Sequence, residues 1–170
     1  RDDFHVLASM GHQEGIIDAD EARAIKALLA FRGLAVRDVM TPRTVMATLP
    51  ADISVADVSP TDPALRFSRI PIFQNGSDDL IGFVRKDEMH IEAAVGHGET
   101  KLVELKHDFL TALENKPLPD LMQKMVSERV SISLVINEYG DPMGIVTMED
   151  LVETMLGMEI VDESDNHIDM

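Results

Sequence analysis

The sequence has no cysteine and no tryptophan, and only 4% of its 170 residues are aromatic. Without cysteine the chain can form neither disulfides nor thiolate metal sites, which fits a reducing compartment. Basic residues are also scarce: 15 Lys and Arg stand against 31 Asp and Glu, so the net charge is −16. Since no cluster of basic and aromatic residues occurs, we expect no nucleic-acid partner.

Long hydrophobic runs are missing as well. Hydrophobic residues make up 45% of the chain, but no run approaches the roughly 18 apolar residues that are needed to cross a bilayer. We therefore expect a soluble segment. The sequence begins with Arg1 and shows no basic leader followed by an apolar stretch, which predicts a piece excised from a longer polypeptide.

No pattern typical of an enzyme is present. We find no nucleophile paired with a base, and Gly76, Gly96 and Gly98 lack the context of a phosphate-binding loop. The six histidines have no metal-ligand spacing. The acidic segment Asp162–Asp169 can attract Mg²⁺, but a solvated, mobile tail is the better interpretation because loosely placed carboxylates make poor sites. We predict a non-enzymatic protein without protein-held metal.

What the sequence does contain is an internal repeat. Gly82–Met89 matches Gly144–Leu151 at an offset of 62 residues, and Ile70–Phe73 matches Ser133–Ile136 at an offset of 63. Each copy predicts a strand, a turn, a second strand and a helix. One copy is too small to bury both faces of its own sheet, so the two copies should pack against each other with pseudo-two-fold symmetry.

Capping and breaker residues give the element boundaries. A capping box formed by Asp18 and Glu21 predicts a helix that ends near Phe31, and Phe4–Met10 suggests a short amphipathic turn or helix before it. The predicted strands are 45–49, 70–73, 80–84, 109–110, 133–136 and 144–146, and further helices are predicted near 54–58, from 86 or 87, at 118–127 and at 148–156. The predicted domains are a helical lead-in at 1–35, repeats at 36–98 and 99–158, and an acidic tail at 159–170.

Four motifs, in this order, carry a resemblance to a known family. They are Asp38–Arg43, Ser68–Pro71, Asn137–Gly140 and Gly144–Asp150. The chain resembles a cystathionine β-synthase (CBS) domain pair, the Bateman module, of the CorC-like and cyclin M-like magnesium and cobalt efflux proteins. The resemblance implies an α+β fold of tandem CBS repeats, each a small three-stranded sheet with flanking helices, preceded by a connector helix. It also implies a cytoplasmic domain attached to a membrane domain of the same polypeptide, in the inner or plasma membrane.

The resemblance further implies an adenosine-nucleotide site between the two repeats. In that family pattern Asp150 accepts hydrogen bonds from the ribose hydroxyls, and Thr147, beside a helix N-terminus, donates one to phosphate. The opposite wall is implied to contain Thr41, Met46, Arg69, Ile70 and Pro71. Among these, Arg69 can neutralise phosphate in an otherwise acidic chain. The implied ligand is AMP, ADP or ATP, and the resemblance leaves open whether Mg²⁺ accompanies it.

Plainer interpretations stand beside these. A Thr followed three residues later by Asp is also an ordinary helix cap, and Arg69 can simply bridge to a surface carboxylate. In the first repeat Arg85 and Glu88 replace the hydroxyl and the shorter acid, so we expect the equivalent cleft to be weak or empty.

The repeat and its motifs leave two functions open. The first is a regulatory module that binds nucleotide and modulates the attached efflux protein. The second is a dimerisation scaffold that has lost its ligand. Both predict a homodimer, and apolar helix faces supply its candidate contacts: Leu121, Met125, Leu151 and Met155.

Overall fold

The computed structural model describes the backbone of residues 19–168 and the side chains of residues 19–158. The predicted turn or helix at Phe4–Met10 lies outside the described residues. The chain divides into two compact units. Unit 1 combines the chain up to Met40 with Glu114–Ser131 and the chain from Val146 onward, and unit 2 comprises Thr41–Leu113 and Ile132–Ile145. The predicted α+β class is confirmed, since the described residues form two sheets and separate helices. Each unit draws on both copies of the repeat.

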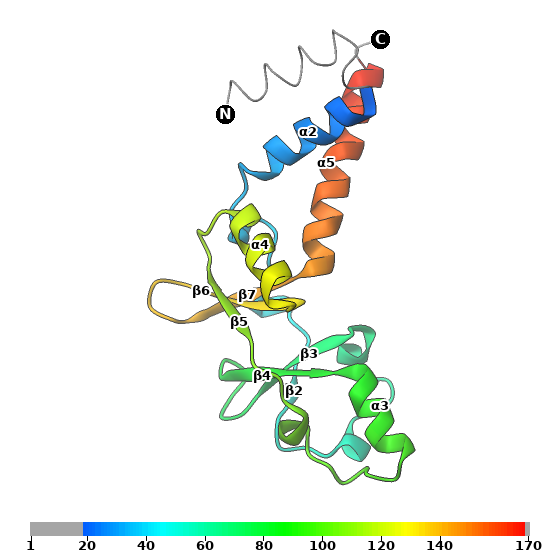
Figure 1. The fold of residues 1–170 in the computed structure, drawn as a ribbon. Coiled ribbons are helices and arrows are strands. Elements are labelled where there is room, and N and C mark those ends of the chain that lie inside the picture. The colour runs from blue at the N-terminus through cyan, green and yellow to red at the C-terminus, as the bar shows by residue number, and fades with distance from the viewer. Residues whose placement is uncertain (1–18, 169–170) are drawn as a thin grey trace. The chain divides into compact units, whose positions relative to one another are not determined.

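The first sheet has three strands in the order β2-β3-β4 (Figure 1). They are β2 (Leu49–Pro50), β3 (Arg69–Phe73) and β4 (Leu80–Arg85), with β2 parallel and β4 antiparallel to β3. The second and third strands confirm the prediction, but the strand expected at 45–49 is reduced to its last residues. A 3₁₀ turn at Arg43–Val45 replaces its start. Val45 is 68% exposed, so this apolar stretch has no sheet face to cover.

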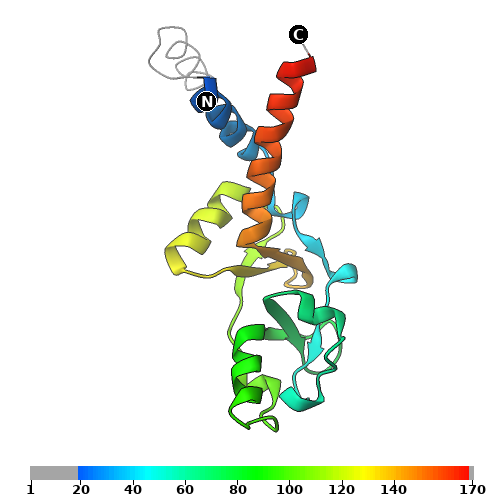
Figure 2. The same cartoon turned by 90° about the vertical axis from the view of Figure 1, so that its right-hand side faces the viewer.

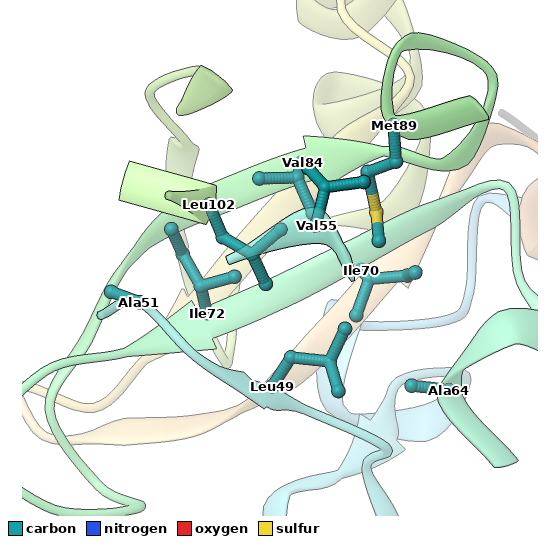
Figure 3. Close-up of a cluster of buried hydrophobic side chains, with 9 residues drawn as sticks. All are labelled: Leu49, Ala51, Val55, Ala64, Ile70, Ile72, Val84, Met89 and Leu102. Carbon is teal, nitrogen blue, oxygen red and sulfur yellow. The ribbon is translucent and has the colours of Figure 1, made fainter. Parts of the chain in front are cut away.

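The core of unit 2 lies on one face of this sheet. Helix α3 (Lys86–Ala94) follows β4 directly, and Figure 3 shows its Met89 side chain reaching toward the strand residues Ile70 and Val84. The predicted brief helix near 54–58 is a 3₁₀ turn at Val55–Asp57. Nine buried residues form the cluster: Leu49, Ala51, Val55, Ala64, Ile70, Ile72, Val84, Met89 and Leu102.

The second sheet has four strands in the order β1-β7-β6-β5. Three were predicted, and they are β5 (Leu110–Leu113), β6 (Ile132–Ile136) and β7 (Pro142–Thr147). The fourth is β1 (Thr41–Pro42), which pairs antiparallel with β7. Strands β5 and β6 are parallel. The sequence did not predict β1 because a two-residue strand has no periodicity.

Unit 1 is helical, and its helices bury apolar side chains against one another. Helices α2 (Ala19–Phe31) and α5 (Met148–Ile168) contact each other, as Figure 1 and Figure 2 both show, and α4 (Leu118–Glu128) also contacts α5. Leu121, Met125 and Leu151 are fully buried within the chain. The prediction that these three side chains form a dimer contact is therefore wrong, because helical spacing reveals an apolar face but not which partner covers it.

Helix α5 is longer than predicted. Its backbone continues to Ile168, whereas the sequence predicted an end at 156 and a mobile acidic tail. No proline and no second glycine follows Gly157 in the helix, and one glycine inside a helix costs only about 1 kcal/mol. Within residues 19–168, no helix combines the length and the apolar character of a membrane span.

Candidate functional site

Thr147 and Asp150 meet where β7 ends and α5 begins. The Thr147 amide donates to Asp150 Oδ2 at 3.0 Å, and the Asp150 amide donates to Thr147 Oγ1 at 3.2 Å. This reciprocal arrangement is a capping box, so the interpretation of the pair as a helix cap is correct. Both groups can still form further hydrogen bonds, because an ionised carboxylate has two oxygens with about four acceptor positions and a hydroxyl can donate while it accepts. The capping box holds both groups at a fixed place on a helix N-terminus.

A cavity of about 460 Å³ adjoins this junction within unit 1. Its lining residues are Leu34, Asp38, Val39, Asp150, Glu153 and Thr154. The volume lies in the range of small-molecule sites, roughly 300 to 1,000 Å³. Two aliphatic side chains and three carboxylates border the cavity, and no Lys or Arg is among its lining residues.

The sequence identified only Asp150 of this lining. Glu153 and Thr154 lie three and four residues further along α5, on the same face of the helix, so the helical period was a usable signal for them. Leu34 comes from the lead-in, and Asp38 lies at the start of the first repeat. The Asp38 side chain is fixed because its Oδ2 accepts from the Ala35 amide at 2.8 Å.

The residues predicted for the opposite wall all belong to unit 2. Thr41 lies in β1 opposite Ile145. Met46 lines a cavity of about 360 Å³ in which Arg43 and Asp78 form an ion pair. The residues that line this cavity are Arg43, Thr44, Met46, Thr48, Ser77, Asp78 and Leu80.

Three further predicted residues begin strand β3. Ile70 and Pro71 are buried, and Ile70 belongs to the core of unit 2. Because the Ile70 side chain is inside the core, a ligand can contact only the main chain of Ile70. Arg69 lines a third cavity, of about 310 Å³, within unit 2. The structure thus brings Thr147 together with Asp150, and it places Arg69 beside Arg85. The lining residues of this third cavity are Ser68, Arg69, Arg85, Lys86, Asp87 and His90.

The junction between β4 and α3 is the first-repeat counterpart of Thr147 and Asp150, and its side chains behave differently. Arg85 pairs with Asp87 at 2.8 Å. Glu88 Oε1 lies 2.5 Å from His107 Nε2, and the His107 ring stacks on Phe83 with centroids 5.3 Å apart. The carboxylate that corresponds to Asp150 therefore pairs with an imidazole, whereas the Asp150 carboxylate accepts from a main-chain amide. In the part of the chain that the structure describes, no group of three or more His, Asp or Glu side chains is placed to hold a metal ion.

Comparison with known proteins identifies the fold. Residues 102–157 match the family model of the CBS domain. UPF0053 protein sll1254 of Synechocystis sp. is 30% identical over 164 residues, which are 96% of this chain and 47% of that protein. The chain thus spans about half the length of this relative.

Solved structures agree with this assignment. The CBS domain of the bacterial CNNM/CorC family Mg²⁺ transporter matches with a TM-score of 0.80 and 21% identity, over 92% of this chain and 96% of that one. The same domain in complex with ATP matches at 0.73 with 23% identity, over 81% and 97%. A CBS-domain pair with bound AMP from Klebsiella pneumoniae matches at 0.59 with 24% identity, over 72% and 98%.

Residues 102–157 thus carry a CBS domain match. The chain is similar to the CBS domains of CNNM/CorC family Mg²⁺ transporters and to UPF0053 proteins, so the resemblance inferred from the four motifs is confirmed.

Proposed function

We propose that the chain is a cytoplasmic regulatory module that binds an adenosine nucleotide and thereby modulates a magnesium or cobalt efflux domain of its parent polypeptide. One observation carries the proposal: the Thr147 hydroxyl and the Asp150 carboxylate are fixed together at a helix N-terminus, and Asp150 lines a cavity of about 460 Å³. The structures of related folds that contain ATP and AMP support it. The alternative is a dimerisation scaffold that binds no ligand.

Each group at the junction fits one part of a nucleotide. The Asp150 carboxylate can accept from two ribose hydroxyls, and hydrogen bonds to a charged acceptor contribute about 1.5 to 3 kcal/mol. The Thr147 hydroxyl and the first amides of α5 suit a phosphate. Leu34 and Val39 offer an apolar surface for the base. The residues that the sequence predicted for the opposite wall, which are Thr41, Met46, Arg69, Ile70 and Pro71, belong to unit 2, so their part in this site stays a prediction.

The negative charge of the residues that line this cavity favours a nucleotide with bound Mg²⁺ over a free nucleotide. Asp38, Asp150 and Glu153 all line it, and two like charges 4 Å apart repel by about 4 kcal/mol near a protein surface. A nucleotide that carries Mg²⁺ on its phosphates avoids much of this repulsion, because the metal neutralises charge where the carboxylates would oppose it. We therefore propose a magnesium nucleotide as the ligand, and we expect ATP to depend on the metal more than AMP does.

The experiment that tests this function is a thermal-shift panel of AMP, ADP, ATP and S-adenosylmethionine, each with and without Mg²⁺. At a concentration one hundredfold above its dissociation constant, a ligand that binds only the folded state adds about 2.7 kcal/mol to the free energy of unfolding. For a chain of this size that amounts to roughly 5 to 10 °C in melting temperature. The absence of a shift with every compound at millimolar concentration would favour the scaffold.

We also propose a homodimer, with a contact surface different from the one that the sequence predicted. Val152 and Leu156 lie four residues apart on α5, and they are 42% and 53% exposed. Residues at that spacing share one face of a helix. Exposed apolar residues on one helix face suit a two-fold contact with a second copy of the chain.

A further inference from the structure

The turn between β3 and β4 contains the dipeptide Asn75–Gly76. It is the one Asn-Gly pair of the sequence, and both residues are exposed. The main-chain nitrogen that follows any asparagine can close a five-membered ring on the side-chain carboxamide. The side chain of the following residue ordinarily obstructs this ring closure, and a glycine has none. Asn75 is therefore the asparagine of this chain that is best suited to react with its own backbone.

The surroundings of Gly76 leave its amide nitrogen accessible. A Cβ at this position would have no heavy atom within 4 Å, and the φ angle is 155°, a value that residues with side chains rarely adopt. Among residues 19–158, no acceptor takes a hydrogen bond from the Gly76 amide, whereas the Gly76 carbonyl accepts from the Asp79 amide at 2.9 Å. The turn is thus closed through the carbonyl, and the nitrogen remains free to attack.

The second repeat has the same clasp across its turn. Asn75 Nδ2 donates to Asp79 Oδ2 at 3.1 Å, and Asn137 Nδ2 donates to Asp141 Oδ2 at 3.2 Å. Both pairs join residues that lie four positions apart, at the offset of 62 residues that relates the two repeats. The two turns therefore provide a matched comparison within one molecule.

Two features protect Asn137 and not Asn75. Glu138 follows Asn137, so a side chain obstructs the ring closure. In addition, Asn137 Oδ1 accepts from the Tyr139 amide and from the Asp141 amide, both at 2.9 Å. In the described part of the chain, the hydrogen bond to Asp79 is the one that the Asn75 carboxamide forms. The Asn75 carboxamide is therefore held less firmly than that of Asn137.

We propose that Asn75 is a self-modification site, at which the chain converts asparagine to aspartate and isoaspartate without an enzyme. The Gly76 nitrogen loses its proton and forms a bond to Asn75 Cγ. The bond between Cγ and Nδ2 breaks, and Nδ2 takes up a proton and leaves as ammonia. Water then opens the cyclic imide at either of its two carbonyls. Water is consumed, ammonia is released, and no atom is oxidised or reduced. The site is independent of the nucleotide function proposed above.

Either product changes the charge and the clasp of the first turn. An aspartate is ionised at neutral pH, so a third carboxylate joins Asp78 and Asp79 in this turn. A carboxylate has no proton to donate to Asp79, so the clasp is lost. Isoaspartate also adds a methylene to the main chain between two paired strands, whose register depends on the turn. The first hairpin should therefore loosen as the molecule ages, and the second should not.

Peptide mapping by mass spectrometry tests the proposal, on the folded 170-residue chain incubated at mildly alkaline pH and physiological temperature. We expect conversion at Asn75 to be at least about tenfold faster than at Asn137, a difference of about 1.4 kcal/mol in activation free energy. The rate should rise with pH, because the Gly76 amide must lose its proton. An isoaspartyl methyltransferase should label the product. The substitution Asn75→Asp, which mimics one product, should lower the melting temperature by about 1 to 4 °C.

Two variants test the role of the glycine. Asn75→Gln should abolish conversion at this position, because the longer side chain would have to close a six-membered ring. Glu138→Gly should raise the rate at Asn137, since it removes the obstructing side chain. An unchanged rate at Asn137 in Glu138→Gly would overturn the role given to glycine.

The same measurement in urea tests whether the folded turn permits the reaction. Conversion of Asn75 should be similar in the folded and the unfolded chain, whereas conversion of Asn137 should rise on unfolding because its two amide donors are lost. The proposal is overturned if Asn75 and Asn137 convert at equal rates in the folded chain. It is likewise overturned if folding slows conversion of Asn75 by about tenfold or more. Neither outcome depends on whether the chain binds a nucleotide.

Discussion

Asp150 has two tasks in our proposal, and substitutions can separate them. In the structure its carboxylate accepts from the Thr147 amide at 3.0 Å, which stabilises the start of α5. In the proposed complex it also accepts from ribose. Asp150→Ala loses both, so we expect a stability loss of about 0.5 to 2 kcal/mol from the cap. We also expect a loss of nucleotide affinity of about 10- to 150-fold, from the 1.5 to 3 kcal/mol of an ionised acceptor.

Asp150→Asn isolates the second task. The asparagine carbonyl oxygen can still accept from the Thr147 amide, so the melting temperature should stay within about 2 °C of wild type, as for a cap that keeps its acceptor. The ionised acceptor is lost, so affinity should still fall about tenfold or more. The matched control is Glu88→Gln at the equivalent position of the first repeat, which should leave nucleotide affinity nearly unchanged.

The assay is calorimetric titration with ATP and Mg²⁺, alongside a melting curve of each variant without ligand. Wild-type affinity in Asp150→Asn would refute the ribose assignment, because only the cap would then need the side chain. An equal loss in Glu88→Gln and Asp150→Asn would mean that the nucleotide is assigned to the wrong junction. Thr147→Ile should weaken binding too, because it removes the donor and crowds the phosphate.

Three other predictions concern the metal, a close backbone contact and the oligomer. Removal of Mg²⁺ should weaken ATP by at least about tenfold more than AMP in calorimetry, and equal dependence would contradict the role given to the carboxylates. Gly82→Ala would bring a Cβ within 2.5 Å of a main-chain carbonyl oxygen, so it should lower the free energy of unfolding by about 1 to 3 kcal/mol in denaturant. The control Gly157→Ala, whose Cβ would have nothing within 4 Å, should stabilise the chain slightly. Similar losses of stability in both variants would refute the close contact at Gly82. The double variant Val152→Asp and Leu156→Asp should be monomeric in light scattering, whereas Ile91→Asp on α3 should remain a dimer, and a dimer in both would exclude this α5 surface.

The strands and helices of the repeat could be predicted because they depend on local sequence patterns. Strands β3, β4, β6 and β7 alternate or run apolar between turn residues, and each second strand passes directly into a helix. What the sequence did not reveal depends on distant pairing. Strand β1 forms because Thr41 pairs with Ile145, which is far away in the sequence. A two-residue stretch contains no sequence pattern that predicts such a partner.

In the candidate site, too, the residues set by local sequence were predictable and those set by distant packing were not. Thr147 and Asp150 were predictable because a capping box has a fixed spacing and the motif placed it at a strand-to-helix junction. Leu34 and Asp38 were not predictable, because only tertiary packing brings the end of the lead-in and the start of the first repeat beside α5. The apolar face of α4 was found, but its partner was misassigned. Local periodicity predicts burial without saying whether the chain itself or a second copy provides it.

A duplicated unit places the same backbone feature, a strand that runs into a helix N-terminus, at two points of the chain. In the second repeat the helix begins with a capping box, and carboxylates border the adjacent cavity. In the first repeat it begins with Arg85, and cations border the cavity. Since both helix starts favour an anion, the side chains decide its form. In our proposal, the carboxylates of the second repeat favour an anion that brings its own cation and offers hydroxyls to Asp150.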